Sequence, residues 1–412
     1  SPALGPAHLP WLFQKDPPKN WPRQSLPEMW ICYRTNPAIS SWKAADVAQR
    51  IAEFPFTVAF AYTDDETNHM ADILLPEATD LESLQLIRIG GTTYTENFWR
   101  QEGWAIRQPA VEPLHGNRDM TDIATELSRQ AGILEDYNKA VNKGAAGAKL
   151  KGEGFDYSLE LKTVHSCDEI WEAHCKSASH QLSDGDEING LDWFKEKGFM
   201  LRDFSQLQWY LQPFLRRQNL RFELPYQERL TRHGRQLANR LKEAEIDWWD
   251  SQLEEYEFLP TYHSFSDIWL NYAEEYDRDP DDYPFWALTS HTMQYQWGGN
   301  VGIPIIKEVA DNVVGHKGVI INRTKALEMG IQDGDQVTIE SVVGETSGEA
   351  QLREGIRPDT VLMIGQFDHW KTPIAKDFNL PSLNSVTDLS LKLTDSTGSG
   401  ADLMRVKITG RN

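Results

Sequence analysis

The sequence is poor in cysteine, and its few cysteines are not spaced for any common site. There are three among 412 residues, at Cys32, Cys167 and Cys175. An odd number excludes a complete disulfide framework, and no pair has the C-x-x-C spacing of a zinc or redox site. No iron–sulfur spacing occurs either. Cys32 lies in the apolar run Met29–Tyr33, so we interpret it as a buried structural thiol.

The sequence also lacks clustered positive charge and long apolar runs. Its formal net charge is −21, spread along the chain without a block of Lys or Arg. This argues against a nucleic-acid surface, because phosphate needs basic neutralisation. No run approaches the roughly 18 apolar residues of a membrane span, and no signal-peptide pattern is present. We therefore expect no membrane span, and the compartment is left open between cytoplasm and periplasm.

A strand–helix–strand pattern follows residues 1–27, a proline- and tryptophan-rich stretch that we interpret as an extended connector. The strand Met29–Tyr33, the helix Ser41–Phe54 with its 3.6-residue apolar period, and the wholly apolar strand Phe56–Tyr62 predict a βαβ unit. Ligands of such units bind at the carboxyl ends of the strands.

Polar side chains follow both strands of this unit at the expected ligand edge. Asn36 comes after the first strand, and Asp64 and Asp65 come after the second. The two carboxylates could contact a ligand, or they could cap the helical turn that follows them. The residues alone leave both roles open.

The region from Pro284 onward has a different pattern. Alternating strands run to the C-terminus, with a polar loop at Thr289–Asn300 after the first of them. The clearest elements are three strands and one short helix, at Pro284–Leu288, Gly318–Asn322, Gln336–Glu340 and Thr324–Met329. Units of this size cannot bury their apolar face alone, so we predict a small closed β structure.

Residues 136–283 carry weaker signals. Asn138–Gly154 is expected to be an exposed loop. The tryptophans and tyrosines from Trp248 to Tyr283 could form a sugar-binding platform, but core aromatics are the favoured interpretation. Helices are predicted at Asp168–His174, Leu191–Lys197 and Leu207–Leu215, with a charged helix that reaches about Ala244.

Four segments, in order along the chain, carry a family resemblance. They are ETNHMADILLP (Glu66–Pro76), GGTTYTEN (Gly90–Asn97), PAVEP (Pro109–Pro113) before the helix Met120–Ala131, and GVIINRTKALEMGIQDGDQVTIES (Gly318–Ser341). Together they resemble the molybdenum/tungsten bis-pterin oxidoreductases of the dimethyl-sulfoxide-reductase superfamily. The resemblance covers the third and fourth domains of a four-domain catalytic subunit.

The resemblance implies an α/β fold: a βαβ-type parallel-sheet domain with a helical insertion, followed by a six-stranded double-psi β-barrel. On this basis residues 28–135 are expected to form an α/β dinucleotide-binding domain. Residues 136–283 would be a mainly helical insertion and connection, and residues 284–412 a barrel that binds molybdopterin dinucleotide.

The implied cofactor is Mo or W held by two molybdopterin guanine dinucleotides. Hydroxyl and amide groups can donate to its phosphates, and carboxylates suit a guanine edge. We expect Asn36, Asp64 and Asp65 to line one dinucleotide, and His369 and Asn384 to line the other together with the polar loop. The remaining candidates, in this loop and after it, are Thr289, Ser290, His291, Thr292, Gln294, Gln296 and Asn322. His291 alone would more often be a surface histidine, and its place in the resemblance reverses that preference.

The chain departs from the family in two ways. No acid directly follows the strand that ends at Tyr62, and the N-terminal half of the family, with its metal ligand and usual [4Fe–4S] site, is missing. The resemblance therefore implies an N-terminal half or companion chain that carries the metal ligand, and an iron–sulfur subunit. A membrane-anchor subunit is left open. We expect part of a catalytic subunit that couples two-electron substrate oxidation or reduction to this electron-transfer partner, and no redox chemistry by the chain alone.

Two segments suggest a branch of the family. Arg221–Leu230 and Phe367–Asn384 look closest to the phenylacetyl-CoA acceptor oxidoreductases and the polysulfide/thiosulfate reductases. The alternatives are a cofactor-free structural subunit or a carbohydrate-binding subunit that uses the aromatic-rich region. A hydrolase is disfavoured because no G-x-S-x-G elbow appears.

Overall fold

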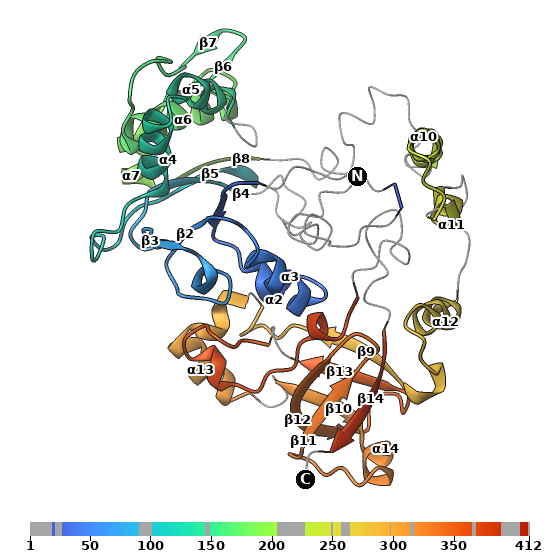
Figure 1. The fold of residues 1–412 in the computed structure, drawn as a ribbon. Coiled ribbons are helices and arrows are strands. Elements are labelled where there is room, and N and C mark those ends of the chain that lie inside the picture. The colour runs from blue at the N-terminus through green and yellow to red at the C-terminus, as the bar shows by residue number, and fades with distance from the viewer. Residues whose placement is uncertain are drawn as a thin grey trace. The chain divides into compact units, whose positions relative to one another are not determined.

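A computed structural model describes residues 19–20, 27–89, 101–144, 149–203, 227–248, 250–256, 264–296, 298–313, 317–364, 368–388 and 404–410 (Figure 1). Several sequence predictions lie wholly or largely outside these residues. They concern the connector 1–27, the segment Gly90–Asn97, the helix Leu207–Leu215 and most of Arg221–Leu230.

The chain divides into two compact units. Residues 1–75 and 226–412 form one, here called the barrel unit, and residues 76–225 form the other, the middle unit. The range predicted for the α/β domain, 28–135, is shared between them. The predicted domain boundaries stay predictions.

The barrel unit begins with the expected βαβ arrangement. Strands β1 (Trp30–Tyr33) and β2 (Thr57–Ala61) pair in parallel, and β3 (Ile73–Pro76) lies on the other side of β2. Between β1 and β2 run two helices, α2 (Pro37–Ser40) and α3 (Ala44–Ile51), and the 3₁₀ turn η2 (Asn68–Met70) precedes β3. The helix predicted at Ser41–Phe54 corresponds to α3, which is shorter at both ends, and α2 precedes it as an additional helix.

Two residues explain why α2 and α3 are separate helices. Pro37 occupies the first turn of α2, where its fixed φ favours an early start. Lys43 has a φ of 53°, in the left-handed region, which separates α2 from α3. The apolar period was nevertheless assigned correctly, since Val47 and Ile51 are buried with Ala38.

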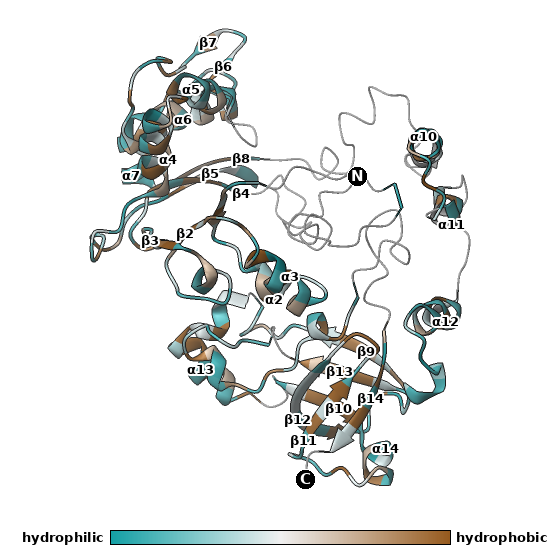
Figure 2. Cartoon of the chain, viewed as in Figure 1, coloured by the Kyte–Doolittle hydropathy of each residue, from teal (hydrophilic) through white to brown (hydrophobic). Residues whose placement is uncertain are grey.

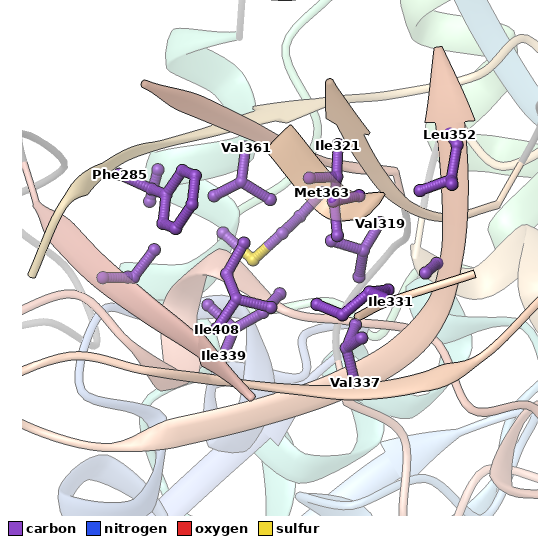
Figure 3. Close-up of a cluster of buried hydrophobic side chains, with 14 of the residues drawn as sticks. Phe285, Val319, Ile321, Ile331, Val337, Ile339, Leu352, Val361, Met363 and Ile408 are labelled. Carbon is purple, nitrogen blue, oxygen red and sulfur yellow. The ribbon is translucent and has the colours of Figure 1, made fainter. Parts of the chain in front are cut away.

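The second part of the unit is a closed six-stranded barrel, which confirms the predicted barrel (Figure 1). Its strand order is β10-β12-β11-β14-β9-β13. Alternate residues point inward, and Met363 lies among aliphatic side chains from neighbouring strands (Figure 3). Figure 2 shows hydrophobic residues, in brown, in several of these strands. The strands are β9 (Phe285–Ser290), β10 (Gly318–Asn322), β11 (Gln336–Glu340), β12 (Glu345–Arg353), β13 (Thr360–Ile364) and β14 (Arg405–Gly410).

The register defines the two ends of the barrel. Strand β9 is parallel to β13, with Ser290 beside Ile364, and β10 is antiparallel to β13, with Gly318 beside Ile364. These three residues mark what we call the Ser290 end. Asn322 is at the other end of β10, beyond Ile321, which pairs with Val361.

The barrel unit also contains helices and turns outside the barrel. In the described part of α12, Trp269 and Tyr272 are buried with Tyr283 and Met404, which agrees with the interpretation of these rings as core aromatics. The further elements of the unit are α10 (Gln227–Glu243), α11 (Asp250–Leu253), η3 (Glu254–Tyr256), α12 (Phe265–Glu275), η4 (Pro280–Asp282), η5 (Gly298–Gly302), α13 (Pro304–Asp311), α14 (Arg323–Glu328), η6 (Ala375–Asp377) and η7 (Leu383–Ser385).

The middle unit combines helices with an antiparallel sheet that the sequence did not predict. The sheet has the order β4-β5-β8, and its residues Leu84 and Leu86 pack with Phe194 and Cys175 from the helices. The strands and helices are β4 (Gln85–Ile89), β5 (Gln101–Arg107), β6 (Lys151–Gly152), β7 (Phe155–Asp156), β8 (Phe199–Asp203), α4 (Met120–Gln130), α5 (Leu134–Lys143), α6 (Cys167–Leu182) and α7 (Leu191–Lys197).

The prediction of an exposed loop at Asn138–Gly154 was wrong in part. Asn138 lies within α5 rather than at the start of an exposed loop, and it is fully buried. Its side-chain amide donates to the carbonyls of Glu160, Leu161 and Thr163, so tertiary contacts hold this segment helical. Among the described residues, no helix is both long enough and apolar enough to cross a membrane.

Candidate functional site

Three loops of the barrel unit meet near the Ser290 end. They are the β2 loop (residues 62–67), the β9 loop (residues 291–296 and 298–302) and the β13 loop (residues 368–372). A methyl group added at Gly302 would lie 3.1 Å from Thr372 Cγ2, and one added at Gly299 would lie 3.9 Å from the Tyr62 hydroxyl. The β9 loop therefore contacts both of the other loops.

A buried carboxylate joins the β2 loop to the β13 loop. Glu66 is 0% exposed. Its Oε1 accepts three successive backbone N–H groups, from Trp370 at 3.0 Å, Lys371 at 2.8 Å and Thr372 at 2.9 Å. Such convergence of backbone N–H groups forms an anion-binding nest, and here the anion belongs to the chain itself.

Side chains complete the surroundings of this carboxylate. Its Oε2 accepts the Thr372 hydroxyl at 2.7 Å and the Asn36 amide at 2.7 Å. His369 Nδ1 lies 3.3 Å from Oε1 and 3.4 Å from Oε2, and His369 is itself buried. Burial acts to raise the pKa of Glu66, but the hydrogen bonds from His369, Thr372 and Lys371 outweigh it and hold that pKa below its usual range.

Asn36 also connects β1 to the β2 loop. Its Oδ1 accepts the Thr67 backbone N–H at 3.1 Å and the Thr67 hydroxyl at 2.8 Å, and Thr67 Oγ1 accepts the Ala38 N–H at 3.0 Å. The Asn36 side chain at the expected ligand edge thus takes part in an intramolecular hydrogen-bond network. Its predicted contact with a dinucleotide stays a prediction.

The two neighbouring aspartates differ in environment. Asp65 is buried, and its Oδ1 accepts the N–H groups of Thr67 at 3.0 Å and Asn68 at 2.8 Å, which is the capping role left open above. Burial raises the pKa of Asp65 to about 6, against the opposing effect of the hydrogen bond from Asn68. Asp64 is half-exposed, and its Oδ2 lies 3.1 Å from Lys371 Nζ.

The candidates at the start of the β9 loop are exposed at the Ser290 end. Thr289, Ser290 and His291 are all exposed, and Thr289 Oγ1 donates to the Met363 carbonyl at 3.2 Å. Thr292 Oγ1 accepts the Tyr295 N–H at 3.3 Å, which shapes the loop. Gln294 is half-buried and Gln296 is exposed.

The last two candidates lie in different places. Asn384 is in η7, and its amide donates to the Ile39 carbonyl at 2.9 Å, so it attaches α2 to the barrel. Asn322 is at the opposite end from Ser290. Its side chain accepts the Lys325 N–H at 3.1 Å and donates to the Ile356 carbonyl at 2.9 Å, which makes it the N-cap of α14. The structure does not bring Asn322 together with the other candidates, because the register of β10 directs it away.

Sequence reasoning missed Glu66, Thr372 and Lys371. Glu66 begins the ETNHMADILLP segment, so its presence in a motif was a usable signal. Its partners in the β13 loop were not predictable, since they lie 303 or more residues further along the chain. Among the described residues, no group of three or more His, Cys, Asp or Glu side chains could hold a metal ion.

Comparisons with known proteins show what this chain is similar to. The family model for the molydopterin dinucleotide binding domain matches residues 288–400. The molybdopterin-containing subunit of thiosulfate reductase from Salmonella typhimurium is 23% identical over 348 residues, which is 82% of this chain and 38% of that protein. The molybdopterin-containing subunit of arsenate respiratory reductase from Chrysiogenes arsenatis is 24% identical over 350 residues, 80% of this chain and 38% of that protein.

Solved structures give the same fold. Acetylene hydratase from Pelobacter acetylenicus aligns with a TM-score of 0.55 and 12% identity, covering 98% of this chain and 46% of that one. The chain spans 38% of the length of the curated relatives it matches. Residues 288–400 therefore match the molydopterin dinucleotide binding domain, and the chain is similar over most of its length to part of the molybdopterin-containing subunits of these two reductases.

Proposed function

We propose that this chain forms part of the catalytic subunit of a molybdenum- or tungsten-dependent oxidoreductase and binds pterin guanine dinucleotide at the Ser290 end of its barrel. The observation that carries the proposal is the exposed set of polar side chains at the end of β9, within the region matched by the dinucleotide-binding family. The metal in such a cofactor supplies two-electron transfer to or from a substrate.

The residues at this end fit the polar parts of a dinucleotide. Ser290 and His291 offer exposed donors and acceptors, and the Lys371 ammonium in the adjoining β13 loop offers a positive charge suited to phosphate. Asp64 lies beside that ammonium and, as a half-exposed carboxylate, suits the donor edge of a guanine. We assign these groups to binding and orientation of the dinucleotide and none of them to the metal.

The reaction itself needs further parts. We propose an N-terminal half or companion chain that holds the metal ligand, and an iron–sulfur partner with a [4Fe–4S] centre that carries the electrons. Similarity to the thiosulfate and arsenate reductase subunits favours sulfur oxyanions and arsenate as the first substrates to assay. Aromatic acyl-CoA is the third substrate to assay, because Phe367–Asn384 resembles the phenylacetyl-CoA branch. Turnover with none of the three would discard this choice of branch.

The binding site can be tested by nucleotide content. We expect Ser290→Ala and His291→Ala to lower the guanine nucleotide released by acid from the assembled, purified enzyme by about tenfold, if each side chain makes one charge-assisted or buried hydrogen bond to the cofactor. Asn322→Ala is the matched control, because Asn322 lies in the same barrel at the opposite end. Equal loss in all three variants, or in none, would contradict the placement.

A further inference from the structure

The carboxylate of Glu66 has more hydrogen-bond partners than a structural cap requires. One oxygen takes three successive N–H groups of the β13 loop, and the other takes the Thr372 hydroxyl and the Asn36 amide. Three N–H groups converging on one atom repel one another unless that atom carries negative charge. The loop conformation is therefore matched to an anion.

We propose that Glu66 is a positioning residue: it acts as a built-in anionic ligand of the β13 loop and holds this loop in the conformation that presents Lys371 at the dinucleotide site. The proposal deepens the proposed function. Only the presentation of Lys371 to a dinucleotide rests on that function, and the holding of the β13 loop by Glu66 does not.

The position of Lys371 explains why the loop conformation matters. Its backbone N–H is held by Glu66 at 2.8 Å, while its side chain points to Asp64 of the β2 loop, with Nζ 3.1 Å from Oδ2. The preceding residue, Trp370, also donates its backbone N–H to Glu66. The Trp370 ring lies edge-on to the His69 ring, with 6.3 Å between the ring centroids. One buried carboxylate thus holds the backbone of both the half-buried Lys371 and the exposed Trp370.

The chain offers a matched control. Glu82 in the middle unit is also a buried carboxylate that accepts backbone N–H groups, from Thr79 at 2.7 Å and Leu114 at 2.9 Å. Its replacement removes the same chemical group without touching the β13 loop. Comparison of the two separates a local role of Glu66 from general loss of stability.

The first measurement is hydrogen–deuterium exchange with chemical rescue, on the full chain. Glu66→Ala deletes the Cγ methylene and the carboxylate, a fragment that acetate matches in size and charge. We expect exchange at residues 370–372 to speed up by at least about tenfold, from loss of a charged hydrogen-bond acceptor. Added acetate should restore slow exchange, whereas propionate, one methylene longer, should not. Glu82→Ala should leave these three amides unchanged.

Two results would overturn the proposal: unchanged exchange at 370–372 in Glu66→Ala, or fast exchange that acetate does not slow. Should Glu66→Ala not fold, Glu66→Gln keeps the side-chain volume and one acceptor oxygen, but it turns an amide donor toward the Asn36 amide and Thr372. Exchange at 370–372 is then expected to rise by about tenfold, and no rise would reject the proposal.

The second measurement uses guanosine diphosphate as the probe of the dinucleotide site. We expect Glu66→Ala to weaken its binding to the full chain by about tenfold, through the misplaced Lys371 ammonium. Acetate should recover the affinity, and Glu82→Ala should match the wild type. Absence of binding to the wild type would reject the dinucleotide site while the exchange experiment still decides the role of Glu66. Normal binding in a Glu66→Ala protein with fast exchange would overturn the positioning role.

Discussion

The pKa values of two adjacent carboxylates in this protein are shifted in opposite directions because their hydrogen-bond partners differ. Asp65 and Glu66 are both buried in the β2 loop. Glu66 receives five hydrogen bonds from backbone and side-chain donors besides the His369 contact, and its pKa is lowered in spite of burial. Asp65 receives two backbone N–H groups, burial dominates, and its pKa rises to about 6. Burial alone therefore does not predict the charge state of a carboxylate.

This contrast predicts a pH-dependent effect of Asp65→Asn. The ordinary pKa of Asp is about 3.9, so the unfolded chain releases this proton more readily than the folded one. The free energy of unfolding of the wild type then falls as pH rises from about 4 to 6. Asparagine keeps the capping oxygen without the charge. We expect Asp65→Asn to raise the free energy of unfolding by about 1–3 kcal/mol at pH 7.5 and to have little effect at pH 4.

Urea denaturation at the two pH values measures this difference. Asp65→Ala serves as the control, because it removes the cap as well and should destabilise the fold at pH 4 by about 1 kcal/mol. A stabilisation by Asp65→Asn that is the same at both pH values would show that the charge of Asp65 is not its origin.

At the scale of single elements, the start of β10 depends on a glycine. Gly318 has a φ of +96°, and a Cβ at this position would lie 2.5 Å from the Glu349 carbonyl oxygen of β12. Both the backbone conformation and the close approach exclude a side chain. Only glycine therefore fits at position 318, where β10 begins at the Ser290 end of the barrel.

We expect Gly318→Ala to lower the free energy of unfolding by at least about 2 kcal/mol more than Gly330→Ala. Gly330 is the matched control, because it also has a positive φ, +77°, but has open space where the Cβ would be. Equilibrium denaturation followed by tryptophan fluorescence compares the two. Equal losses would mean that the contact with Glu349 is relieved by a small shift of the strand.

At the scale of the whole molecule, the cysteines bear on the need for a partner. All three are buried, and burial raises the pKa of each thiol to about 12. Among the described residues, no group of three or more His, Cys, Asp or Glu side chains could hold a metal ion, so these cysteines do not form a cluster site there. This supports the proposal that the electron-transfer centre lies on a companion segment or subunit.

We expect the chain of 412 residues, expressed alone, to contain no stoichiometric molybdenum, tungsten or iron and to show no turnover. Metal analysis by mass spectrometry measures this directly. The same analysis of the assembly with its partner should give one Mo or W per chain together with iron. Stoichiometric metal and turnover in the isolated chain would refute the proposed dependence.

Much of the fold was accessible from local pattern. Alternation of apolar residues at Val319 and Ile321, and again at Val337 and Ile339, predicts strands with one buried face, and these side chains are fully buried in the barrel. The wholly apolar run at Phe56–Tyr62 similarly predicts a strand covered on both sides. The antiparallel sheet of the middle unit was missed because its strands, such as Gln101–Arg107, mix charged and small residues without clear alternation.

The sequence by itself determined strands of the barrel and the βαβ unit, because each rests on spacing between near neighbours in the chain. Only the tertiary structure decided which polar residues share a site. It joined Glu66 to the N–H groups of residues 370–372, and it sent Asn322 to the far end of the barrel through the register of β10. Backbone N–H groups have no signature in a sequence, and register depends on long-range pairing. The partners of a buried charge therefore cannot be found from the residue types alone.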